Sequence, residues 1–156
     1  MPNITRRFIG HLQTNKVNKC LELFDTIDSV DSFKLAKKIN NRSTFLNKKT
    51  PILLEINTSG DDSKKGFSPN LDDDFYSIFE LDSLKVDGLM TMGPLSQKED
   101  ETRSAFALLR KIKTKINDQL PGEPIKELSM GMSGDFQIGI EEGSTMIRLG
   151  TAIFGK

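Results

Sequence analysis

Glycines and hydroxyl side chains alternate in the last thirty residues, where six of the chain's 12 glycines lie. Ser133 lies in the turn 131–135, and Thr151 follows Gly150 in a second small-residue turn. Each turn comes directly after a short apolar run. Glycine lets backbone N–H groups approach a ligand closely, and the two hydroxyls add further donors. The pattern predicts a phosphate-binding site at the carboxyl ends of two neighbouring parallel strands.

Arg148 interrupts the apolar run Met146–Leu149. A charge inside a buried strand is costly unless it is paired or bound to a ligand. We therefore take Arg148 as a candidate ligand-binding residue. The alternative is that its side chain points outward to a surface carboxylate, and the sequence leaves this alternative open.

Other catalytic and metal-binding chemistries have little support in the sequence. His11 is the only histidine and Cys20 the only cysteine, and Ser133 does not lie in a G-x-S-x-G motif. His11 follows a predicted strand, where it either lines the site or is hydrogen-bonded near the core. The carboxylates Asp72–Asp74 fall on a predicted helix surface. We expect neither a metal site nor a catalytic residue.

The composition indicates an ordinary soluble protein without an electrostatic preference for a polyanion. Basic and acidic residues balance at 22 each, which gives no support for binding nucleic acid or an anionic membrane. A single cysteine fits a reducing compartment, and no apolar run is long enough to span a membrane. We expect a cytoplasmic protein.

Apolar periodicity predicts alternating strands and helices in one domain that covers residues 1–156. The predicted strands cover 8–10, 26–30, 51–57, 84–92, 127–130 and 145–149, and the predicted helices cover 13–24, 33–39, 71–81, 98–120 and 136–140. Ser133 or Asp135 is expected to cap the last helix. The loop Thr58–Asn70 is expected to be solvated and mobile. The alternative is that Lys64 and Lys65 in this loop contact a phosphate.

Several motifs together resemble a known family over nearly the whole chain. They are SMGMSGDF, EEGSTMIRLGTAIFG, FIGHLQTNK, IDSVDS, EINTSGDDSKKGF and GLMTMGPL. In this order they resemble the pyridoxal 5′-phosphate homeostasis family, whose fold is related to the N-terminal barrel of alanine racemase. The resemblance implies an α/β fold of the TIM-type (β/α) barrel class, truncated here to about six βα units.

The resemblance also implies roles for individual residues. Ser133, Gly150 and Thr151 match positions that bind the cofactor phosphate. Ser129 would lie beside the ring or the phosphate, and Arg148 matches the arginine that faces the pyridine nitrogen. Because an arginine does not give up its proton, the ring nitrogen would stay unprotonated and the cofactor would be a poor electron sink. The implied function is intracellular pyridoxal phosphate homeostasis, without catalytic turnover.

The chain departs from the family pattern at its start. The family's first two βα units, which carry the lysine that attaches the cofactor covalently, have no counterpart here. We therefore expect reversible cofactor binding, two exposed sheet edges and an exposed inner face. Self-association or a complementing N-terminal chain would follow from such edges. Two alternatives remain open: a racemase-like enzyme completed by a separate N-terminal chain, and a non-functional fragment of a mis-started reading frame.

Overall fold

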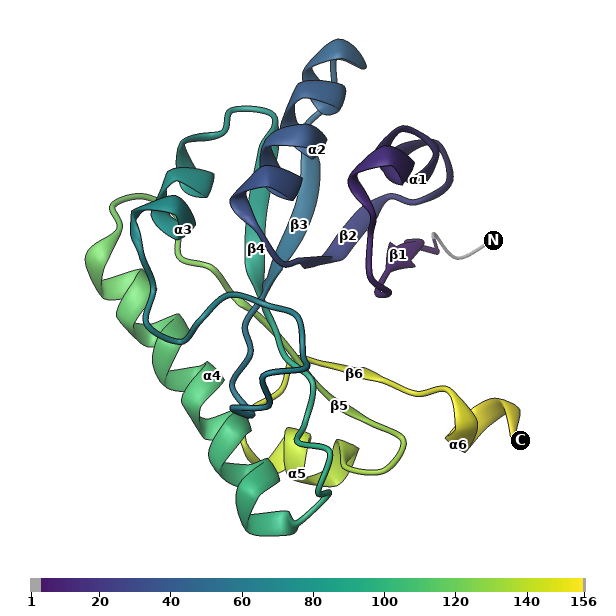
Figure 1. Ribbon diagram of the computed structural model, residues 1–156, viewed down its shortest axis with the longest axis vertical. Coiled ribbons are helices and arrows are strands. Elements are labelled where there is room, and N and C mark those ends of the chain that lie inside the picture. The colour runs from purple at the N-terminus through teal and green to yellow at the C-terminus, as the bar shows by residue number, and fades with distance from the viewer. Residues whose placement is uncertain (1–3, 156) are drawn as a thin grey trace.

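A six-stranded parallel sheet in the order β1 to β6 forms the centre of the computed structural model, which describes residues 4–155. The strands are β1 (Arg7–Phe8), β2 (Thr26–Val30), β3 (Thr50–Glu55), β4 (Leu84–Met90), β5 (Glu127–Met132) and β6 (Met146–Arg148). Each strand pairs in parallel with the next along the chain. The sheet curls into an open barrel (Figure 1). The predicted α/β class and the truncated barrel of six βα units are confirmed.

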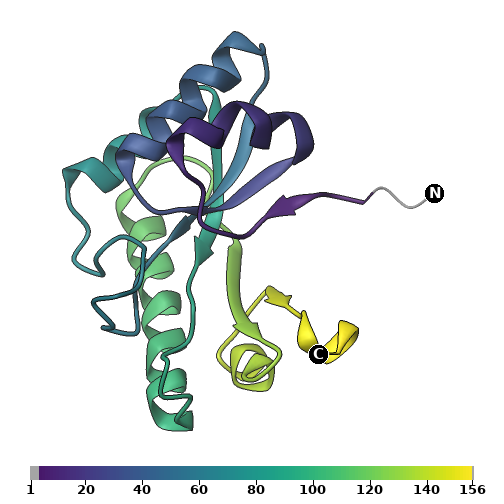
Figure 2. The same cartoon turned by 45° about the vertical axis from the view of Figure 1, so that its right-hand side comes forward.

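Helices follow the strands; those after the first five strands cover the outer face of the sheet, whereas the short helix after β6 lies apart from it and buries no residue (Figures 1 and 2). They are α1 (Val17–Leu23), α2 (Phe33–Phe45), α3 (Asp73–Ser77), α4 (Glu99–Gln119), α5 (Phe136–Glu141) and α6 (Thr151–Phe154), with 3₁₀ turns at Thr14–Lys16 and Ile78–Glu80. Sequence periodicity predicted five of these helices and missed α6, because four residues are too few to show a helical period.

Capping at the helix starts is set by short polar side chains. Ser32 accepts a hydrogen bond from the backbone N–H of Leu35 and so caps α2. Asp135 is the residue before α5, but its carboxylate accepts from the N–H of Met132 instead. Ser133 does not cap α5 either. The expected side-chain cap of this helix was therefore wrong, because both candidate side chains bind elsewhere in the turn.

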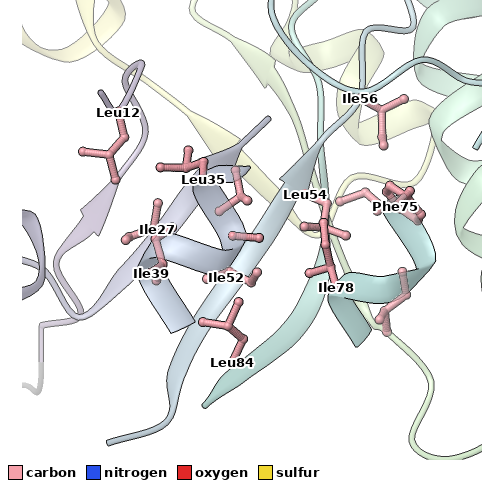
Figure 3. Close-up of a cluster of buried hydrophobic side chains, with 14 of the residues drawn as sticks. Leu12, Ile27, Leu35, Ile39, Ile52, Leu54, Ile56, Phe75, Ile78 and Leu84 are labelled. Atoms are coloured by element: carbon pink, nitrogen blue, oxygen red, sulfur yellow. The ribbon is translucent and has the colours of Figure 1, made fainter. Parts of the chain in front are cut away.

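The apolar core lies between the outer face of the sheet and the helices (Figure 3). Ile52, Leu54 and Ile56 alternate along β3 and its extension, and pack with Leu35 of α2 and Phe75 of α3. Alternate residues of a strand point to opposite faces, so Leu53 and Glu55 lie on the inner face. This alternation keeps the helix contacts of β3 on its outer face and places Glu55 on the opposite one.

The inner face of the central strands is buried, contrary to the exposed inner face that we expected. Leu53, Met90 and Ser129 are each at most 1% exposed. The strong curl of the sheet brings inner side chains of non-adjacent strands together, because parallel strands twist and coil. The edge strands β1 and β6 are partly buried, and the exposed residues of the described strands are Lys85 of β4 and Met132 at the end of β5.

Candidate functional site

Arg148 lies on the inner face of β6 and is 7% exposed. Its Nη1 donates to Ser129 Oγ at 2.7 Å, and its Nη2 donates to the carbonyl of Thr91 at 2.8 Å. Its Nε is buried without a hydrogen-bond partner among residues 4–155. The surface-carboxylate alternative for Arg148 is therefore wrong. Two of its nitrogens fix the guanidinium, and the third is an enclosed donor without a partner among the described residues.

The charge of Arg148 has no carboxylate in direct contact within the described part of the chain. Burial lowers the pKa of its guanidinium, while the more distant carboxylates of Asp135, Glu55 and Asp28 act in the opposite direction. The ordinary pKa of an arginine side chain is so far above neutral pH that the guanidinium stays charged. The protein thus holds a buried positive charge that only polar groups and distant anions compensate.

Ser133 connects the turn after β5 to the start of α6. Its Oγ accepts hydrogen bonds from the backbone N–H groups of Gly150, at 3.2 Å, and Ala152, at 3.1 Å. The hydroxyl proton of Ser133 therefore remains free to be donated outward. Thr151 is the first residue of α6 and is exposed. The structure brings together the three residues that the sequence assigned to a phosphate.

Ser129 lies deeper than this cluster. It is a buried residue of β5, paired in register with Met90 and Met146, and its hydroxyl is used by Arg148. It is thus separated from the Ser133–Thr151 cluster and supports the arginine that faces the site.

Two glycines allow α5 to pack directly on β5, which sets the position of the Ser133 turn. Gly131 has φ +102°, in the left-handed region that favours glycine. A Cβ on Gly139 would lie 2.7 Å from the carbonyl oxygen of Met130. A side chain at either position would push the helix away from the strand.

Two buried carboxylates on the inner face were not among the site residues that we predicted from the sequence. Asp28 is fully buried on β2 and accepts from Arg7 Nη1, at 3.0 and 3.2 Å, and from Thr26 Oγ1, at 3.1 Å. Glu55, at the end of β3, is 9% exposed. Burial raises the pKa of both carboxyls. The signal that could have found them is the one that singled out Arg148, a charge within an apolar strand.

The loop Thr58–Asn70 contacts the start of the β4–α4 connection, while nearly half of its residues are exposed, as expected of a solvated loop. Lys64 donates to the carbonyl of Gly93, and Asp61 accepts from the N–H of Leu95 at 3.3 Å. Phe67 forms an isolated bridge with Ile56. The ammonium group of Lys64 therefore makes a contact within the protein.

The other residues that could carry chemistry lie apart from the Ser133–Thr151 cluster in the described part of the chain. Residues 4–155 contain no cluster of three metal-ligating side chains. His11 is half-exposed and lies 3.4 Å from Asp31, and Cys20 is buried in the core. Within the same residues, no helix has both the length and the apolar composition needed to cross a membrane.

Comparison with known proteins places this geometry in a family. The family described as "Alanine racemase, N-terminal domain" matches residues 4–156. The pyridoxal phosphate homeostasis protein of a Synechocystis species is 41% identical over 154 residues, which cover 98% of this chain and 70% of the relative. The chain belongs to the alanine racemase N-terminal domain family and, within it, to the pyridoxal phosphate homeostasis proteins.

Other members of the family show how much of them this chain covers. The pyridoxal phosphate homeostasis protein of Aquifex aeolicus is 39% identical over 150 residues, which cover 96% of this chain and 65% of that relative. The chain therefore spans about two thirds of the length of these curated relatives, between 65% and 70%.

Solved structures confirm the family fold. PipY of Synechococcus elongatus, solved without pyridoxal phosphate, is 35% identical with a TM-score of 0.92, over 99% of this chain and 73% of that chain. PipY was also solved with pyridoxal phosphate bound, at 34% identity and a TM-score of 0.89. Alanine racemase of Clostridium difficile is 17% identical with a TM-score of 0.79, over 40% of that chain, and shows only the shared fold.

Proposed function

We propose that this chain is a single cytoplasmic domain that binds pyridoxal 5′-phosphate and contributes to its homeostasis without catalytic turnover. Ser133, Gly150 and Thr151 would hold the phosphate, and Arg148 would face the pyridine nitrogen. The observation that carries the proposal is the buried, unpartnered Nε of Arg148 beside a preformed Ser133–Gly150 contact. The homologue PipY, solved with pyridoxal phosphate bound, supports it.

The residues present fit this cofactor chemically. The hydroxyls of Ser133 and Thr151 and the free N–H of a short helix start suit an anionic phosphate ester. Bound pyridoxal phosphate supplies an electron-withdrawing ring, and a protonated arginine opposite the ring nitrogen limits that property. The chain's own residues thus bind and orient the cofactor and restrain its reactivity, which suits a carrier.

Titration with pyridoxal phosphate, followed by absorbance, tests the proposal. We expect saturable, reversible binding that Arg148→Ala and Thr151→Ala each weaken at least tenfold, because each removes a charged or hydroxyl donor. Arg103→Ala is the matched control, since Arg103 pairs with Glu99, Glu141 and Glu142 on the surface of α4 and α5. Binding that survives both site variants, or its absence from the unmodified chain, would contradict the proposal.

Borohydride reduction followed by mass analysis tests the attachment of the cofactor in the same sample. We expect no trapped cofactor, because none of the chain's lysines matches the position of the family lysine. A single labelled lysine would show covalent attachment and would reopen the racemase-like alternative.

We also propose that the chain associates through its sheet edges, either with a second copy or with separately encoded strands. Strands β1 and β6 each pair on one side only. Exposed apolar side chains flank them, Ile9 and Leu23 near β1 and Ile153 and Phe154 after β6. Unpaired parallel edges with apolar neighbours favour strand addition. Light scattering after size exclusion tests this, and a purely monomeric chain at high concentration, with a cooperative melt, would contradict it.

A further inference from the structure

Glu55 is a buried acid without a partner. It is the last residue of β3, on the inner face, and is 9% exposed. No side chain or backbone N–H in the described part of the chain donates a hydrogen bond to its carboxylate. Asp28, one strand away, accepts from both Arg7 and Thr26. The carboxylate oxygens of Glu55 are not among the fully enclosed polar atoms that lack a partner, so they reach solvent and are open to a ligand.

The charged groups that act on Glu55 come from the carboxyl ends of the neighbouring strands. Asp31 follows β2 and His11 follows β1, and these two side chains lie 3.4 Å apart. Arg148 approaches from β6. Burial raises the pKa of Glu55 most, and Asp31 raises it further, while Arg148 and His11 act in the opposite direction. Val30 and Leu54 are paired in register, so Asp31 and Glu55 are neighbours at the ends of β2 and β3.

The mouth of the open barrel therefore has two unlike walls. Asp31, after β2, and Glu55, at the end of β3, make one wall acidic. The other wall consists of Arg148, Ser133 and Thr151, whose side chains donate hydrogen bonds to anions. Each wall holds a polar group without a partner among the described residues: the Glu55 carboxylate, whose oxygens reach solvent, on one and the enclosed Nε of Arg148 on the other. These are independent observations that indicate one ligand with groups of opposite charge.

The acidic wall suits an ammonium better than a metal ion. Residues 4–155 contain no group of three ligands that could hold a metal. Two carboxylates with one nearby imidazole give a protonated amine the acceptors that it needs. We propose that Glu55, assisted by Asp31, binds a protonated primary amine on a ligand whose phosphate is held by Ser133, Gly150 and Thr151.

This inference rests on the proposed function and narrows its ligand class to amine-bearing phosphate esters of the pyridoxal type. Pyridoxamine 5′-phosphate is such a ligand, and pyridoxine 5′-phosphate is its matched analogue with a hydroxyl in place of the amine. Glu55 is thereby a specificity-determining residue, because a carboxylate discriminates an ammonium from a neutral hydroxyl.

Calorimetric titration of the chain with these two ligands tests the inference. We expect the amine to bind about tenfold more tightly than the hydroxyl analogue, as for a charge-assisted hydrogen bond. Glu55→Gln should remove this preference by weakening only the amine complex. Asp31→Asn should reduce it less. Lowering the pH should also reduce the preference in the unmodified chain, since protonation removes the charge of Glu55.

The binding of pyridoxine 5′-phosphate by Glu55→Gln is the folding control, because this ligand uses the phosphate wall but makes no ammonium contact. Glu99→Gln, on the exposed start of α4, is the matched surface control. A preference that is missing in the unmodified chain, or that persists in Glu55→Gln, would overturn the inference alone. Failure of both ligands and of pyridoxal 5′-phosphate to bind would overturn the proposed function and this inference together.

Discussion

The two faces of the curled sheet use their buried residues in opposite ways. The outer face packs aliphatic and aromatic side chains of β2 to β5 against the helices, with Phe75 and Phe106 fully buried. The inner face buries charged groups, of which Asp28 is fully paired, Arg148 is partly paired and Glu55 has no partner. Apolar burial stabilises the fold directly, whereas an unpaired buried charge lowers its stability.

The difference between the faces teaches where the ligand belongs. On the outer face, the side chains of the sheet pack against those of the helices. On the inner face, Asp28 of β2 has hydrogen-bond partners, whereas the carboxylate of Glu55 and the Nε of Arg148 have none among the described residues. Glu55 and Arg148 are the last residues of β3 and β6, at the mouth of the barrel. Desolvation of the charges of Glu55 and Arg148 costs free energy that no protein partner fully offsets. We infer that a ligand from outside the chain supplies the missing partner.

Removal of a large outer-face side chain should have the largest effect on stability. Phe75→Ala should lower the free energy of unfolding by about 3–5 kcal/mol, because it leaves a cavity among Phe67, Tyr76 and Phe79. Chemical denaturation measures this loss. Phe45→Ala is the control, since Phe45 is 77% exposed, and it should change stability by about 0.5 kcal/mol or less. Equal losses of unfolding free energy in the two variants would show that the burial of Phe75 does not stabilise the fold.

Loss of a paired inner-face charge should have the next largest effect. Asp28→Ala leaves Arg7 and Thr26 without their acceptor and should cost about 2 kcal/mol in the same assay. Asp25→Ala, which breaks a surface pair with Arg6, should cost much less. If Asp28→Ala were neutral, the inner ion pair would contribute nothing to the fold.

Replacement of the unpaired charge should have the opposite sign. The folded-state pKa of Glu55 is raised above its ordinary value of 4.5, so the folded chain binds the proton more tightly than the unfolded chain. The contribution of Glu55 to stability is therefore greatest below pH 4.5 and is lost as the pH rises through the folded-state pKa. Glu55→Gln lacks this loss and should be the more stable protein at neutral pH.

Melting temperatures measured across this pH range, for the unmodified chain and Glu55→Gln, give the comparison. The difference should grow as the pH rises. A Glu55→Gln variant that is less stable at neutral pH would show that the ionised carboxylate has an internal partner.

The smallest expected effect concerns the contact between Ser133 and α6. Ser133→Ala removes the acceptor for the N–H groups of Gly150 and Ala152, and should change global stability by about 1 kcal/mol or less, because α6 is exposed. Hydrogen exchange at these two amides should become faster. Ser104→Ala on α4 is the control and should leave both amides unchanged. Unaltered exchange in Ser133→Ala would mean that another group holds α6.

The sequence by itself determined the six strands, five of the six helices and the two glycine-hydroxyl turns that we propose to hold a phosphate. The apolar runs of β2, β3 and β4 and the period of α4 are local signals, and they predicted those elements to within a few residues. The Gly-Ser and Gly-Thr turns were readable because backbone conformation and hydroxyl donors are properties of the residues themselves.

Only the tertiary structure decided which buried charges are paired and which are not. Arg148, Asp28 and Glu55 look alike in the sequence, as single charges within apolar strands. The curl of the sheet gives Asp28 the guanidinium of Arg7, gives Arg148 the hydroxyl of Ser129, and leaves Glu55 without a donor. The pairing of a charge depends on residues that are 19 or more positions away in the chain, so no local pattern records it.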